Sequence, residues 1–144
     1  MVQRFDHVTF VVNDVDRVKS FFSLLGFVED KRVVISGPKF ATYMAVPGIE
    51  AEHVTLVLAE ASPRTEIQLL KYRHPATDAP IEPGNPTRYG FNHICFAVKD
   101  IEAEIERLQR NGVALLNEMM DFHERKLVFL KAPEGIVVEL AEWS

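Results

Sequence analysis

Four polar side chains in or beside strand-like runs have the chemistry of metal ligands. His7 and His93 each lie near the start of a run rich in β-branched and aromatic residues, and Gln68 and Glu139 lie inside two later apolar runs. Imidazole nitrogen, amide oxygen and carboxylate oxygen suit a borderline divalent ion such as Zn, Ni, Co, Mn or Fe. A carboxylate within Ile136–Leu140 is also costly to bury without a partner. The pattern predicts a metal site formed by His7, Gln68, His93 and Glu139.

An internal repeat relates the two histidines. An offset of 93 − 7 = 86 superimposes His7 on His93. At this offset the strand, the helix cap, the apolar stripe of the helix and the glycine that ends the helix also coincide. The matching pairs are Asp14 with Asp100, Val15 with Ile101, Phe22 with Leu108, and Gly26 with Gly112. Such a register indicates a duplication. If the two halves pack about a pseudo-twofold axis, the four polar side chains can converge on one point.

The elements that position these side chains follow the same order in both halves. Each half shows a strand, a helix and then three strand-like runs, which predicts an α+β fold of two tandem βαβββ modules. The expected helices follow Asp14 and Asp100, and the expected strands are 5–12, 27–35, 53–58, 66–72, 91–98, 113–116, 126–130 and 136–140. The chain is expected to form one domain, 1–144, with a first module at 1–74, a proline-rich linker at 75–90 and a second module at 91–144. An insertion at 37–48 in the first module has the pattern of a helical turn.

Composition excludes several classes of protein. The chain has 144 residues, of which 47% are hydrophobic, so it can bury a core and is not a disordered chain. Its net charge of −5, without a basic cluster, argues against a nucleic-acid partner. Cys95 is the only cysteine, and no run has the pattern of a signal peptide or a membrane span. We expect a cytoplasmic protein with no membrane partner.

Other titratable residues have competing interpretations. Glu66 lies two positions before Gln68 and should share its face of the sheet, so it is a candidate base, or a ligand if the register differs. A solvated glutamate at a strand end is the structural alternative. His53, His74 and His123 have no counterparts in the repeat and are predicted to be surface or loop residues.

The chain resembles the vicinal oxygen chelate superfamily, which includes glyoxalase I, methylmalonyl-CoA epimerase, extradiol dioxygenases, and bleomycin- or fosfomycin-resistance proteins. The matching motifs are 5–12 with the helix that follows, 93–98 with Asp100, and 132–140. The resemblance implies that the sheets of the two modules curl into a cupped cleft around a metal ion, and that His7, Gln68, His93 and Glu139 occupy the ligand positions. It also implies a homodimer, with the cleft completed within one chain or across two.

The ligand set is similar to that of methylmalonyl-CoA epimerases, whereas many bacterial glyoxalase I proteins have a glutamate at the position of Gln68. The third strand carries Thr55, Leu56 and Val57, where some epimerases carry a glutamate base. The resemblance therefore implies an epimerase or a glyoxalase without choosing between them.

The expected activity is that of a metal-dependent lyase or isomerase, similar to lactoylglutathione lyase or methylmalonyl-CoA epimerase. Its substrate would be a small thioester or thiol adduct, from which Glu139 or Glu66 removes a proton next to a carbonyl while the ion stabilises the enediolate. One alternative is an extradiol dioxygenase with iron on His7, His93 and Glu139. The other is a small-molecule-binding resistance protein without turnover.

Overall fold

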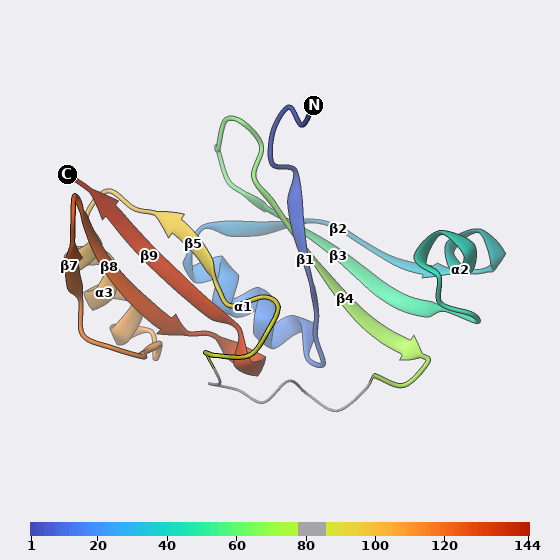
Figure 1. Cartoon of the computed structure of the whole chain (residues 1–144). Helices are drawn as coiled ribbons and strands as arrows, with labels where there is room; N and C mark the ends of the chain where they lie inside the picture. Colours follow the sequence, from blue (N-terminus) through green and yellow to red (C-terminus); the bar gives the residue numbers. More distant parts are fainter. Residues whose placement is uncertain (78–85) are drawn as a thin grey trace. The chain divides into compact units, whose positions relative to one another are not determined.

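The computed structural model describes residues 1–77 and 86–144. The chain divides into two compact units, Met1–Ala79 and Pro80–Ser144. Residues 78–85 belong to the expected linker 75–90 and lie outside the described residues. In the described part of the chain, no helix is both long enough and apolar enough to cross a bilayer. Each unit is built on one sheet of its own (Figure 1).

The first unit contains a four-stranded sheet in the order β1-β4-β3-β2. The outer strand β1 runs parallel to β4, and the other neighbouring strands are antiparallel. The elements in chain order are β1 (His7–Val11), α1 (Val15–Leu24), β2 (Phe27–Ser36), α2 (Pro38–Met44), β3 (Glu50–Leu58) and β4 (Glu66–His74).

Helix α1 begins and ends where the sequence predicts. The Asp14 side chain accepts a hydrogen bond from the Arg17 backbone N–H, and Gly26 follows the helix with a φ of 99°, which glycine adopts without a side-chain clash. The buried stripe packs onto one face of the sheet, where the ring of Phe22 lies 6.0 Å from that of Phe10 and 5.9 Å from that of Phe27. This face is therefore the core face of the first unit.

The insertion at 37–48 forms α2, so the predicted helical turn is confirmed. Gly37 and Gly48 have φ values of 91° and 69°, a conformation that side chains disfavour. The helix contributes Ala41 and Met44 to an apolar cluster with Ile35, Ile49, Ala51, Leu70, Val46 and Tyr72. This cluster holds the far ends of β2, β3 and β4 together.

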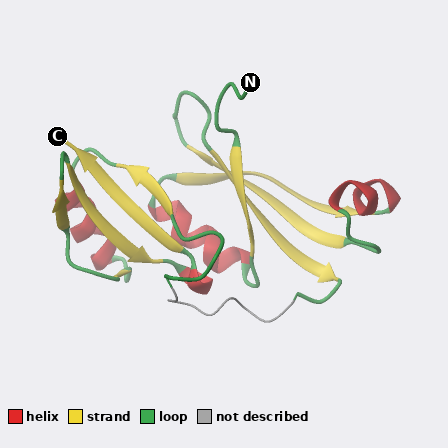
Figure 2. Ribbon diagram, in the orientation of Figure 1, coloured by secondary structure: helices red, strands yellow, loops and turns green. Residues whose placement is uncertain are grey.

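The second unit repeats the arrangement with a sheet in the order β5-β9-β8-β6, to which β7 adds by pairing with β8. Strand β5 is parallel to β9, as β1 is to β4, and α3 lies against one face of the sheet (Figure 2). Ile101 and Leu108 of α3 are buried. The elements are β5 (Ile94–Ala97), α3 (Ile101–Arg110), β6 (Ala114–Leu115), β7 (Met120–Phe122), β8 (Arg125–Lys131), the short 3₁₀ helix at Pro133–Gly135, and β9 (Val137–Trp143).

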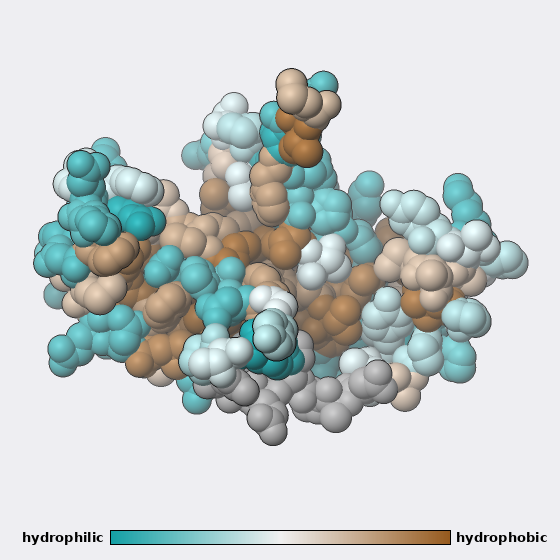
Figure 3. All heavy atoms as spheres, viewed as in Figure 1, coloured by the Kyte–Doolittle hydropathy of each residue, from teal (hydrophilic) through white to brown (hydrophobic). Residues whose placement is uncertain are grey.

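Several strand boundaries and one element differ from the sequence prediction; for example, β3 begins at Glu50 and β9 ends at Trp143. Strand β1 begins at His7 rather than Phe5, and β5 begins at Ile94 rather than Phe91, because Phe5 and Phe91 precede the paired residues and are exposed. Hydrophobic side chains of the N-terminal segment are visible on the surface in Figure 3. The short strand β7 was not predicted, since three exposed residues carry no alternating pattern. The βαβββ order is otherwise confirmed in both units.

The packing of α1 gives a stability prediction. Replacing the fully buried Phe22 by alanine (Phe22→Ala) should lower the free energy of unfolding by about 3–5 kcal/mol, because a cavity replaces contacts with three aromatic rings. Urea denaturation followed by circular dichroism measures the change. The exposed Arg17→Ala on the same helix is the control and should change stability by less than about 0.5 kcal/mol. Equal stability of the two variants would contradict this packing.

Candidate functional site

Alternation along β1 and β4 places one group of polar side chains on the face of the first sheet opposite α1. Phe10 faces the helix, so His7 and Thr9 face the other side. The parallel register pairs His7 with Glu66 and Thr9 with Gln68. The predicted ligands His7 and Gln68 therefore share a face with the predicted base Glu66.

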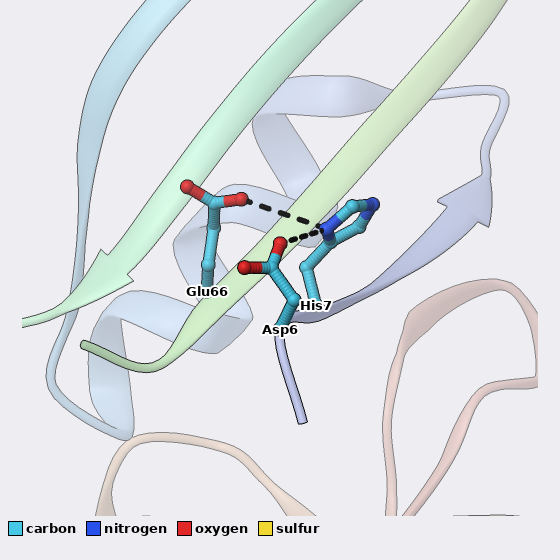
Figure 4. Close-up of side chains that lie close together, drawn as sticks. All are labelled: Asp6, His7 and Glu66. Atoms are coloured by element: carbon cyan, nitrogen blue, oxygen red, sulfur yellow. Dashed lines mark hydrogen bonds and ion pairs between the residues drawn. The ribbon is translucent and has the colours of Figure 1, made fainter. Parts of the chain in front are cut away.

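The Nδ1 atom of His7 faces two carboxylates, those of Asp6 and Glu66 (Figure 4). Its Nδ1 is 2.6 Å from Asp6 Oδ2 and 3.9 Å from Glu66 Oε2. A carboxylate only accepts, so Nδ1 donates to Asp6, and this hydrogen bond is the main cause that lowers the pKa of Asp6. In the neutral imidazole, Nε2 then keeps its lone pair. One ligand atom from each of Asp6, His7 and Glu66 can also be chosen so that all three lie within 4.8 Å of one another.

The amide of Gln68 is held at both of its ends. Its Nε2 donates to Glu66 Oε2 at 2.9 Å, and its Oε1 lies 2.9 Å from His53 Nε2. The hydroxyl of Thr9 donates to the same Oε1 at 3.5 Å. The prediction that His53 is a surface or loop residue is wrong, because this half-buried histidine lies in β3 and contacts a predicted metal ligand.

Both oxygens of Glu66 have donors. Arg64 donates to Oε1 from Nη2 at 3.0 Å and from Nε at 3.3 Å, while Gln68 donates to Oε2. The Glu66 side chain is only 15% exposed. Glu66 is the first residue of β4, as the strand-end alternative expects, but its side chain is not a solvated one.

In the second unit, His93 and Glu139 lie in contact. Cys95 pairs with Glu139 across the parallel β5 and β9, as Thr9 pairs with Gln68 across β1 and β4. His93 lies just before β5, and its Nε2 is 3.5 Å from Glu139 Oε1, while its ring lies edge-on to that of Phe129. Glu139 alternates with the buried Val138 and Leu140, so its carboxylate lies on the face opposite α3.

The proton on His93 can be placed from its neighbours. The Asn92 amide nitrogen donates to the carbonyl oxygen of Pro86 at 2.9 Å, so the amide oxygen faces His93 Nδ1 at 2.7 Å. Nδ1 must therefore donate, and the neutral imidazole presents a lone pair on Nε2 to the Glu139 carboxylate. His93 Nε2 and Glu139 Oε1, both electron-pair donors, then face each other across 3.5 Å. A cation between them, whether a proton or a metal ion, would bind both atoms.

Asp6 and Asn92 are site residues that the sequence interpretation missed. Each precedes a histidine and accepts its Nδ1–H, an arrangement that in metalloproteins fixes the tautomer of the ligand. The offset of 86 that aligns His7 with His93 also aligns Asp6 with Asn92, and this signal was available in the sequence.

Cys95 lies beside Glu139 on the same face. Desolvation, together with the hydrogen bond to Glu139, raises the pKa of the Cys95 thiol to about 11. The thiol is therefore protonated at neutral pH and donates to the carboxylate.

Comparison with known proteins identifies the family. The sequence model of the Glyoxalase/Bleomycin resistance protein/Dioxygenase superfamily matches residues 4–140. A lactoylglutathione lyase of Pseudomonas aeruginosa is 28% identical, over 97% of this chain and 82% of that protein. Glyoxalase I of Saccharomyces cerevisiae is 34% identical over 68 residues, which cover 46% of this chain and only 21% of that protein.

Solved structures agree on the fold. A glyoxalase family protein from Bacillus cereus superimposes with a TM-score of 0.87 at 25% identity, covering 99% of this chain and 95% of that one. A fosfomycin resistance protein from Listeria monocytogenes has a TM-score of 0.68 at 18% identity, covering 100% and 96%, and shows the fold alone. With a family match over nearly its whole length, the chain belongs to the Glyoxalase/Bleomycin resistance protein/Dioxygenase superfamily, the vicinal oxygen chelate family.

Proposed function

We propose that the chain is a divalent-metal-dependent lyase or isomerase whose ion is bound by His7, Gln68, His93 and Glu139. The observation that carries the proposal is the facing pair of His93 Nε2 and Glu139 Oε1, with the imidazole proton committed to Asn92. The first unit offers the matching pair, His7 with its Nδ1 committed to Asp6 and Gln68 on the neighbouring strand.

The donor atoms fit a borderline ion. Two imidazole nitrogens, an amide oxygen and a carboxylate oxygen suit Zn, Ni, Co, Mn or Fe, and leave positions for substrate oxygens. The group of Asp6, His7 and Glu66 is a weaker candidate, because the His7 atom near both carboxylates is Nδ1, which already donates to Asp6, and because Asp6 is exposed. Nε2 is therefore the proposed ligand atom of His7.

The proposed chemistry is removal of a proton next to a carbonyl. The bound ion would act as a Lewis acid that stabilises negative charge as it develops on oxygen. Glu139 is the favoured base, with one carboxylate oxygen for the ion and the other for the proton. Arg64 and Gln68 donate N–H groups to both oxygens of Glu66, whereas Glu139 accepts from the Cys95 thiol, a weak donor. Return of the proton to the neighbouring carbon gives a glyoxalase reaction, which relatives named lactoylglutathione lyase favour, and return to the same carbon gives epimerisation.

The substrate is proposed to be an anionic thiol adduct or thioester. Strand pairing puts Arg125 and Trp143 opposite each other on the face that carries Glu139, and the guanidinium lies 4.8 Å from the centre of the indole. None of the ion pairs found among the described residues involves Arg125, so its charge is open to a carboxylate or phosphate of a substrate.

The metal proposal predicts that His93→Ala loses the ion. Affinity for Ni²⁺, measured by calorimetry on metal-free protein, should fall more than roughly 100-fold, beyond what loss of a supporting hydrogen bond costs. His123→Ala, which removes an exposed histidine of the same unit, should bind as the parent does. Unchanged affinity in a folded His93→Ala variant would contradict the proposal.

The choice of base predicts different effects of two matched substitutions. With the thiol adduct of methylglyoxal or with methylmalonyl-CoA as substrate, Glu139→Gln should lower kcat roughly 100- to 10,000-fold, since it removes the proton acceptor. Glu66→Gln should lower kcat less than Glu139→Gln does, because it leaves the proton acceptor in place and removes only one of the two acceptor oxygens that bind Arg64 and Gln68. The reverse order would identify Glu66 as the base.

Oxygen uptake with a catechol and ferrous ion, without turnover of either thiol compound, would instead indicate a dioxygenase.

The role of Arg125 predicts an effect on KM rather than on kcat. Arg125→Ala should raise KM for an anionic substrate about tenfold, the cost of one charge-assisted hydrogen bond, with kcat little changed. Arg110→Ala removes an exposed charge at the end of α3 and serves as the control. Equal KM values for the two variants in steady-state assays would rule out this substrate contact.

A further inference from the structure

We infer that His53 is a positioning residue that presents the oxygen of the Gln68 amide to the ion. The inference rests on the proposed function, because it assigns a role to a neighbour of one proposed ligand. His53 lies in β3, next to β4, and its Nε2 is 2.9 Å from Gln68 Oε1.

The direction of the hydrogen bonds fixes the orientation of the amide. The Glu66 carboxylate can only accept, so the Gln68 nitrogen, and not its oxygen, must face Glu66 Oε2 at 2.9 Å. The oxygen then faces His53, so His53 Nε2 must carry a proton and donate. His53 is therefore the Nε2–H tautomer in its neutral form, the opposite of the tautomer assigned to His7 and His93.

Strand register explains why His53 reaches this oxygen. In the antiparallel pair of β3 and β4, Thr55 lies directly opposite Gln68 and His53 lies opposite Leu70. A diagonal neighbour two residues along is within reach of a long aromatic side chain.

The nitrogen end of the Gln68 amide is held by a series of hydrogen bonds between charged side chains and the amide. Arg64 donates to Asp30 Oδ2 and to Glu66 Oε1, both at 3.0 Å, and Glu66 accepts from Gln68. His53 completes the series by donating to the oxygen. Without His53, the donor left to the amide oxygen among the described residues would be the Thr9 hydroxyl at 3.5 Å, too long for a firm hydrogen bond.

This arrangement matters because only one end of an amide can bind a cation. A carbonyl oxygen has two lone pairs, so Oε1 can accept from His53 and still offer the second pair to an ion. Rotation of the amide by 180° would present hydrogens instead. Neighbours that orient metal ligands typically change metal affinity 10- to 100-fold when they are removed.

The first test compares metal affinity in four proteins: the parent, His53→Ala, His53→Gln and His74→Ala. His53→Ala should weaken Ni²⁺ binding, measured by calorimetry, roughly 10- to 100-fold. His53→Gln supplies another N–H donor and should restore most of the affinity. His74 is exposed at the end of β4, so His74→Ala should bind as the parent does.

A second measurement needs neither metal nor activity. Long-range ¹H–¹⁵N spectra of the metal-free parent protein should show His53 protonated at Nε2 and His93 protonated at Nδ1. A His53 ring protonated at Nδ1 alone would overturn the inference, even if His53→Ala failed to fold.

The outcomes separate the two proposals. If His53→Ala binds Ni²⁺ within twofold of the parent while His93→Ala does not bind, the role of His53 is wrong and the metal site stands. If neither substitution weakens binding, both the site and the role of His53 are overturned. Weaker binding by His53→Ala that His53→Gln does not restore would also overturn the positioning role, since it would reflect loss of packing.

Discussion

The parallel pairing of the first and last strands of each module is the constraint on which the site depends. It places a residue from β1 beside Gln68 in the first unit and a residue from β5 beside Glu139 in the second, at equivalent positions. Because side chains alternate along a strand, the same pairing that buries apolar residues against a helix puts polar residues on the opposite face. A shift of one residue in either register would send Gln68 or Glu139 into the core.

Hydrogen-bond direction gives this geometry its chemical meaning. Asp6 and Asn92 take the Nδ1 protons of His7 and His93, while Glu66 takes a proton of the Gln68 amide. The atoms that remain, two imidazole nitrogens and one amide oxygen, are electron-pair donors, and Glu139 adds a carboxylate. The contacts within each unit thus leave four electron-pair donor atoms, two nitrogens and two oxygens, in the orientation that a metal ligand needs.

Much of the fold could be predicted from local signals. Asp14 and Asp100 mark helix starts, Gly26 and Gly112 mark helix ends, and the offset of 86 reveals the repeat, because each of these signals is local in sequence. Strand ends were less predictable: Phe5 and Phe91 have strand-like side chains, yet they precede β1 and β5, whose paired residues begin at His7 and Ile94. His53 was missed because its contact with Gln68 is diagonal across two strands, and a diagonal contact depends on register rather than on spacing along the chain.

The central claim is that one ion binds the donor atoms contributed by both modules. An anomalous difference map from crystals of the Ni²⁺-loaded protein tests it most directly. The claim predicts a single strong peak at coordination distance from His7 Nε2, Gln68 Oε1, His93 Nε2 and a Glu139 oxygen, with the ligands drawn from one chain or from two. A peak held instead by His7 Nδ1 with Asp6 and Glu66, or no peak at all near Glu139, would contradict it.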